Sequence, residues 1–183
     1  MSNVREHPAD IRGQEQMRKW ERLLANPVVA QTLRAAGWTP ERSVDATRWL
    51  DLFRREGVPA LPAAISILES FGDLSVKPTR SDTSVFSPSR IDFDPQRFYF
   101  PGEGEFFRGG EGPLGVNGCP IGERGDQSGL VLLEDGRLVE DLGQWTFRIL
   151  GHDFEDALVH MILADRPPPP YKPPPTPSDV PTE

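Results

Sequence analysis

Apolar residues recur at helical spacing through the N-terminal third of the chain. The first such stretch covers residues 14–25, and a second begins at Asn26, a favourable helix N-cap, with Pro27 at the first helical position. Two more stretches, over about residues 43–56 and 61–71, each end at a glycine, which is a typical helix stop. The pattern predicts that this part of the chain is helical.

A tryptophan occupies the joint between two of these helices. The helix that begins at Asn26 is predicted to end at Gly37, because glycine adopts the left-handed conformation at no steric cost. Trp38 follows at once, and the residue after such a glycine often folds back onto the last helical turn. Thr39 and Pro40 suit the start of the next helix. We therefore expect Trp38 to be buried between the two helices and to hold them together.

After these helices the pattern changes to the short alternating runs of β-strands. Residues 74–78, 84–88 and 90–95 are such runs, and each is closed by a proline. Residues 128–143 predict a hairpin with Asp135-Gly136 at its turn. The intervening glycine-rich stretch, residues 101–125, is expected to be mostly loop.

The last regular element is a predicted helix over residues 152–164, capped by Asp153. Helices followed by strands and a final helix indicate an α+β fold, in which N-terminal helices pack on a small antiparallel sheet with a C-terminal helix. We divide the chain into an N-terminal helical extension (1–25), the main domain (26–164) and a proline-rich tail (165–183). The tail is expected to be disordered and dispensable for folding, or else to act as a docking segment for an aromatic-grooved domain.

Charge and composition exclude several classes of function. The net charge of −8 disfavours nucleic acid and anionic membranes as partners. A single cysteine allows no intramolecular disulfide, and the N-terminus has no signal-peptide pattern. A cytoplasmic protein is therefore expected.

Catalytic, metal-binding and cofactor-binding constellations are not found. The glycine-rich stretch lacks the lysine and following helix of a phosphate-binding loop. His152 and His160 are eight residues apart, too far for one metal ion without other ligands, and are interpreted as incidental residues of a solvated helix. Cys119 has no identifiable base and is interpreted as a small buried residue. We expect no enzymatic activity and no cofactor.

Acidic side chains are the best candidates for contact with a partner. Asp92 and Asp94 alternate on a predicted strand and would face the same side, and we expect the hairpin tip to lie close to them. The residues proposed to bind a partner are Asp92, Asp94, Glu103, Glu105, Glu134 and Asp135. Such a patch would attract a basic protein, although an ordinary solvated surface is the alternative interpretation.

Several motifs carry a resemblance to a known family. They are Gly37-Trp38-x-Pro40-x-Arg42-x-Val44-Asp45, Phe71-Gly72, Asp94-Pro95, and Pro120-Ile121-Gly122 followed by the Asp135-Gly136 hairpin. In this order and spacing, over about residues 30–163, the chain resembles the third subgroup of the SUKH superfamily. One departure is Asp73, where a second small residue, usually glycine, would follow Phe71-Gly72.

The resemblance implies a non-enzymatic bacterial immunity protein, encoded beside a polymorphic toxin and binding that toxin's domain, often a nuclease or nucleic-acid deaminase. It also implies a structural role for Gly37, Trp38, Pro40, Arg42, Phe71, Gly72 and Gly122. A monomer is favoured. Two other functions stay open: a scaffold or regulatory module that docks through its tail, and a hydrolase using Asp92, Asp94 and a histidine, for which no complete catalytic set can be named.

Overall fold

Six antiparallel strands form one sheet, and each strand pairs with its neighbour in sequence. The computed structural model describes residues 19–98, 102–110, 112–125 and 127–174. The strands are β1 (Ser75–Val76), β2 (Ile91–Asp92), β3 (Gly118–Arg124), β4 (Ser128–Leu133), β5 (Leu138–Asp141) and β6 (Phe147–Gly151).

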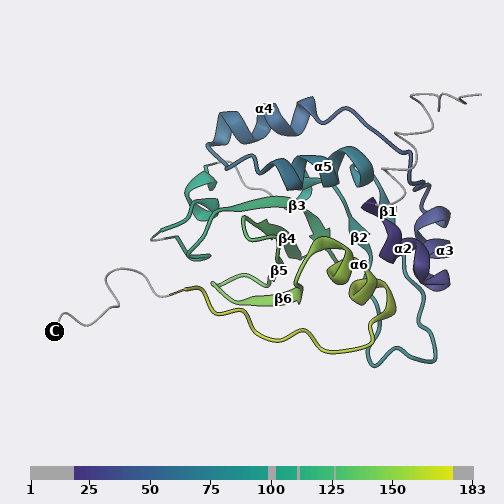
Figure 1. Cartoon of the computed structure of the whole chain (residues 1–183). Coiled ribbons are helices and arrows are strands. Elements are labelled where there is room, and N and C mark those ends of the chain that lie inside the picture. The colour runs from purple at the N-terminus through teal and green to yellow at the C-terminus, as the bar shows by residue number, and fades with distance from the viewer. Residues whose placement is uncertain (1–18, 99–101, 111, 126, 175–183) are drawn as a thin grey trace, which may run out of the picture.

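Helices cover the sheet from two directions. In Figure 1, α4 and α5 lie above β3, while α2 and α3 lie at the right of the view and contact α6. The elements are α2 (Glu21–Ala25), α3 (Pro27–Ala35), α4 (Thr47–Glu56), α5 (Pro62–Phe71), α6 (Phe154–Leu163) and the 3-10 helices η1 (Pro95–Arg97) and η2 (Gly104–Phe107). The predicted α+β fold is confirmed, with its N-terminal helices, antiparallel sheet and C-terminal helix.

Two of the predicted helix caps, Asn26 and Asp153, are present in the structure, whereas no helix begins at Thr39-Pro40 as predicted. The Asn26 side chain accepts hydrogen bonds from the backbone N–H groups of Val28 and Val29, and so caps α3. The helix predicted from about residue 43 begins only at Thr47. The N-cap position is Ala46, and just before it the Asp45 carboxylate accepts the Thr47 N–H at 2.9 Å in a local turn that precedes the helix.

Trp38 is fully buried at the joint where the sequence predicts it. Gly37 is left-handed (φ 90°), and the Trp38 N–H donates to the carbonyl of Leu33 at 3.0 Å, which closes the end of α3. The indole stacks on Phe71 of α5, with ring centroids 5.3 Å apart. The observed ring contact therefore ties α3 to α5, whereas the sequence predicted that Trp38 would hold α3 against the next helix in the chain, which is α4.

Phe71 is the centre of an aromatic cluster. Besides Trp38, its ring lies within 5.0–5.3 Å of Trp20, Phe93 and Phe154. Trp20 is 3 % exposed, so the described end of the predicted N-terminal extension contributes to the core of the domain.

Arg42 and Gly72 complete the end of α5. The Arg42 guanidinium donates to the carbonyls of Ser70 and Gly72 at 3.1 and 2.8 Å, which satisfies acceptors that a helix end leaves open. A Cβ at Gly72 would overlap the Trp49 ring. Asp73 is left-handed (φ 66°), which explains why the family pattern favours glycine there.

The central strand β3 lies within the stretch that the sequence predicts to be mostly loop. Proline and glycine usually argue against a strand. Here they are accommodated by an irregularity, because the β3–β4 register shifts between Pro120 and Gly122. Gly122 has a φ of 157°, and a Cβ there would overlap the carbonyl oxygen of Asp92. Glycine is therefore required at position 122, because β2 approaches too closely to leave room for a side chain.

The strand predicted over residues 84–88 is wrong. Val85 N–H and Ser84 Oγ–H donate to the carbonyls of Ala164 and Leu163, at 2.8 and 2.7 Å. The segment pairs with the end of α6 instead of with a strand, and it satisfies carbonyls that the helix leaves open.

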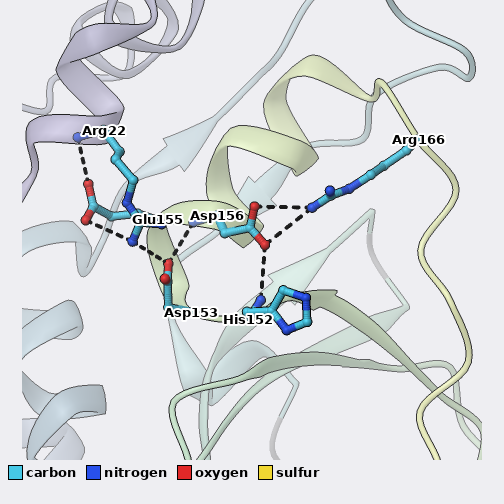
Figure 2. A network of polar contacts seen from close by, with 6 residues as sticks. All are labelled: Arg22, His152, Asp153, Glu155, Asp156 and Arg166. Atoms are coloured by element: carbon cyan, nitrogen blue, oxygen red, sulfur yellow. Dashed lines mark hydrogen bonds and ion pairs between the residues drawn. The ribbon is translucent and has the colours of Figure 1, made fainter.

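Polar contacts attach α2 to the start of α6 (Figure 2). Arg22 on α2 reaches Asp153 at 2.7 Å and Glu155 at 3.4 Å, and its backbone N–H also donates to Glu155. Asp156 extends the network to Arg166 at 3.2 Å. The carboxylates suit the positive end of the α6 dipole, so the network positions both helices.

Residues 165–174 do not follow the expectation of a disordered tail. This segment runs along β6 in Figure 1, and Ile149 N–H donates to the carbonyl of Pro169 at 2.8 Å. Tyr171 is 5 % exposed, and its hydroxyl donates to the carbonyl of Leu114 at 2.7 Å. One aromatic residue among the prolines is enough to fix the segment on the sheet.

We predict that Trp38→Ala lowers the free energy of unfolding by about 3–5 kcal/mol, the usual range for removing a packed large aromatic. Chemical denaturation measures the change. An unfolding midpoint equal to that of the parent protein would show that the joint does not hold α3 and α5 together.

We also predict that Tyr171→Ala lowers the free energy of unfolding by about 2 kcal/mol, because a buried ring and one hydrogen bond are lost. Lys172→Ala is the matched control, since its side chain is exposed. Equal stability of the two variants would mean that the segment packs without stabilising the domain.

Candidate functional site

Asp92 is buried within an ionic cluster, so the prediction that it is an exposed contact residue is wrong. It is 3 % exposed, and its carboxylate lies 2.5 Å from Arg90 Nε and 3.4 Å from Arg97 Nη1. Glu123 stands opposite it on β3 and joins the same arginines. Alternate residues of a strand are exposed only if one face of the sheet meets water. Both residues of β2 are buried, so neither of its faces is open to solvent.

Asp94 lies after β2 and has a structural role. Its Oδ1 accepts the Trp49 indole N–H at 3.1 Å and the backbone N–H of Gln96 at 3.2 Å. It therefore caps η1 and anchors α4, so its carboxylate is engaged within the fold.

Glu134 and Asp135 are exposed at the β4–β5 turn, where the hairpin was predicted. Leu133, the last residue of β4, pairs with Gly118, whereas Asp92 pairs with Glu123. From Gly118 to Glu123 a strand extends roughly 16 Å at its usual rise. The expected closeness of the hairpin tip to Asp92 is therefore wrong.

Two further hairpin acids are also buried. Glu140 is 3 % exposed and forms an ion pair with Arg124 at 3.0 Å. Asp141 is 5 % exposed and accepts the Gly143 N–H, while burial raises the pKa of its carboxyl. Both carboxylates are therefore engaged within the sheet and its adjoining turn.

Glu103 and Glu105 remain exposed beside η2. They line a cleft of about 460 Å³ together with Phe106, Gly112, Pro113 and Trp145. A second cleft of about 370 Å³ shares Glu103, Phe106 and Trp145 and extends toward Asp141. The glycine-rich segment therefore brings two of the six predicted carboxylates to an open cleft.

Trp145 is the functional candidate that sequence reasoning missed. It lies in the turn between β5 and β6 and is 71 % exposed. The sequence does carry a signal for a turn here, because Gly143-Gln144 directly precedes Trp145. The strand after it, β6, was however not predicted. Sequence alone therefore did not place Trp145 at a hairpin tip.

The described residues contain no evident catalytic chemistry. Burial raises the pKa of the Cys119 thiol to about 12, so it is protonated and unreactive at neutral pH. His160, expected on a solvated face, is 3 % exposed and lies 2.5 Å from Asp165. Within the described ranges, no histidine, cysteine, aspartate and glutamate side chains group to hold a metal ion, and no helix could cross a bilayer.

We predict that Asp92→Asn lowers the free energy of unfolding by about 1–3 kcal/mol, because it removes a buried charge from two arginines. Asp135→Asn removes an exposed carboxylate paired with Arg137 and should change stability by less than about 0.5 kcal/mol. Urea denaturation of both variants tests the assignment, and similar losses would contradict it.

Comparison with known proteins gives one family match. The model of the SUKH-3 immunity protein matches residues 25–164, which include all the motifs described above. No curated protein and no solved structure shows a significant match. Immunity proteins of this family are not enzymes, and their role implies neutralisation of a cognate toxin. Because the match covers most of the chain, the protein belongs to the SUKH-3 immunity protein family.

Proposed function

We propose that the chain neutralises a toxin domain that acts on nucleic acid, either a nuclease or a nucleic-acid deaminase. The monomeric protein acts in the cytoplasm of the producing cell and covers the active or substrate-binding surface of the toxin. The observation that carries this proposal is the excess of 28 acidic over 20 basic residues. An enzyme that acts on nucleic acid must offer a basic surface to phosphates, and an acidic protein is attracted to that surface.

The proposed contact set is smaller than the one suggested by the sequence. Glu103, Glu105, Glu134 and Asp135 are exposed and support electrostatic attraction over distance. Asp92 and Asp94 are excluded, because their carboxylates are engaged within the fold.

The alternative of a scaffold with a docking tail has less support. Docking through a proline-rich segment requires an accessible extended chain. Residues 165–174 instead contact β6 and the glycine-rich segment, and Tyr171 is buried. Neutralisation by surface coverage needs no free tail.

We predict that reversal of the four exposed carboxylates to lysine slows association with the toxin domain about tenfold or more at low salt. The reason is loss of long-range attraction, so the difference should shrink at high salt. Association rates are measured with the toxin domain encoded by the neighbouring gene, and co-expression scores survival of the host cell.

The matched control reverses Glu41 and Asp51, which are exposed on other elements. A nucleic-acid substrate of the toxin should also compete with the parent protein for binding. Simultaneous binding of substrate and immunity protein, or association that does not depend on salt, would overturn the proposed mode of neutralisation.

A further inference from the structure

Trp145 is held out of the core by its own backbone. Gln144 and Trp145 both have positive φ angles, 50° and 63°, in a turn closed by a hydrogen bond from Leu142 N–H to the Thr146 carbonyl at 2.9 Å. Left-handed residues other than glycine cost about 1 kcal/mol or more each, and such strain gathers at functional sites. The other three tryptophans of the chain are at most 3 % exposed.

The exposed indole is supported from beneath by other rings. Phe106 lies 6.2 Å from Trp145 and 6.0 Å from Phe147, and Phe147 is only 4 % exposed. The three rings run from the interior to the surface. Phe106 and Trp145 therefore form a supported aromatic wall of the 460 Å³ cleft.

The charges at this cleft are mostly negative. Glu103 and Glu105 line it, and Glu105 pairs with Arg108 at 2.6 Å. Arg108 also donates to the Gly57 carbonyl, which holds it toward α4. No ion pair joins Glu103 to another residue in the described part of the chain. One carboxylate beside the indole is therefore left for a cation from outside.

We infer that this cleft receives an arginine or lysine side chain from the toxin, a proposal that rests on the proposed function. The cation lies over the Trp145 indole and pairs with Glu103 at the rim. An aromatic face attracts a guanidinium or ammonium group, and a nearby carboxylate adds charge and hydrogen bonding.

The same chemistry explains how the cleft would block a nucleic-acid enzyme. Nucleic acid offers such an enzyme a flat base and negative phosphates, and basic side chains bind both. An indole flanked by a carboxylate presents a flat ring and a negative charge together. The cationic side chain that it captures is therefore one that the toxin uses for its substrate.

Fluorine NMR on the full chain labelled with 5-fluorotryptophan tests the site directly. The four tryptophans give separate signals, and Trp145→Phe assigns the exposed one. A hexa-arginine peptide should shift the Trp145 signal alone, and Glu103→Gln should weaken that shift at least threefold. The matched control is Glu41→Gln, an exposed glutamate outside both the cleft and the proposed contact set, which should leave the shift unchanged.

The unlabelled toxin domain encoded by the neighbouring gene is the second probe. It should shift the Trp145 signal, and Trp145→Ala should weaken toxin binding about thirtyfold or more, as at an interface hot spot. Val85→Ala, also an exposed apolar residue (60 %), should change binding less than twofold. The thermal midpoint of Trp145→Ala should match the parent, because the side chain is exposed.

The possible results of these experiments distinguish a failure of the cleft proposal from a failure of the proposed function. If the toxin binds and is neutralised while the Trp145 signal stays unchanged, the cleft is not the docking site and the proposed function stands. A toxin that does not bind the parent protein overturns both. A peptide shift that survives Glu103→Gln overturns the pairing with Glu103.

Discussion

The Phe71 side chain lies where four parts of the chain meet. Trp20 is the N-cap of α2, Trp38 lies at the α3 joint, Phe93 directly follows β2, and Phe154 begins α6. Edge-to-face and stacked pairs of this kind add about 0.5–1.5 kcal/mol each beyond the area that they bury. Because short elements such as β1 and β2 have few contacts of their own, the cluster determines where they lie.

The motif residues around this cluster have structural roles for the same reason. Arg42 and Gly72 close α5 just beyond Phe71, and Asp94 anchors Trp49 of α4. None of them leaves a charge or an apolar face for a partner. The turns and the glycine-rich segment are where side chains can differ without disturbing the core, and the contact with a toxin is proposed there for that reason.

Local signals in the sequence predicted much of this fold. Asn26 and Asp153 cap helices, and Asp135-Gly136 makes a hairpin turn, because each acts through its immediate backbone neighbours. The central strand β3 could not be predicted in this way, since its bulge at Gly122 depends on the approach of β2. Asp92 shows the same limit: its type suggested a surface residue, but β2 is covered on both faces, and the nearby Arg90 and Arg97 pair with the buried carboxylate.

The contrast between Asp92 and Glu103 shows that carboxylate side chains serve two purposes in this protein. A carboxylate between two arginines is neutralised and contributes to the fold, so it offers little field to a partner. A carboxylate beside an exposed indole, such as that of Glu103, contributes nothing evident to packing and lies open to solvent at a cleft. The net charge of −8 is therefore an incomplete guide to recognition, because a buried and paired acid such as Asp92 attracts a partner less than an exposed acid does. Of the exposed acids, Glu103 and Glu105 lie beside the aromatic wall of the Trp145 cleft.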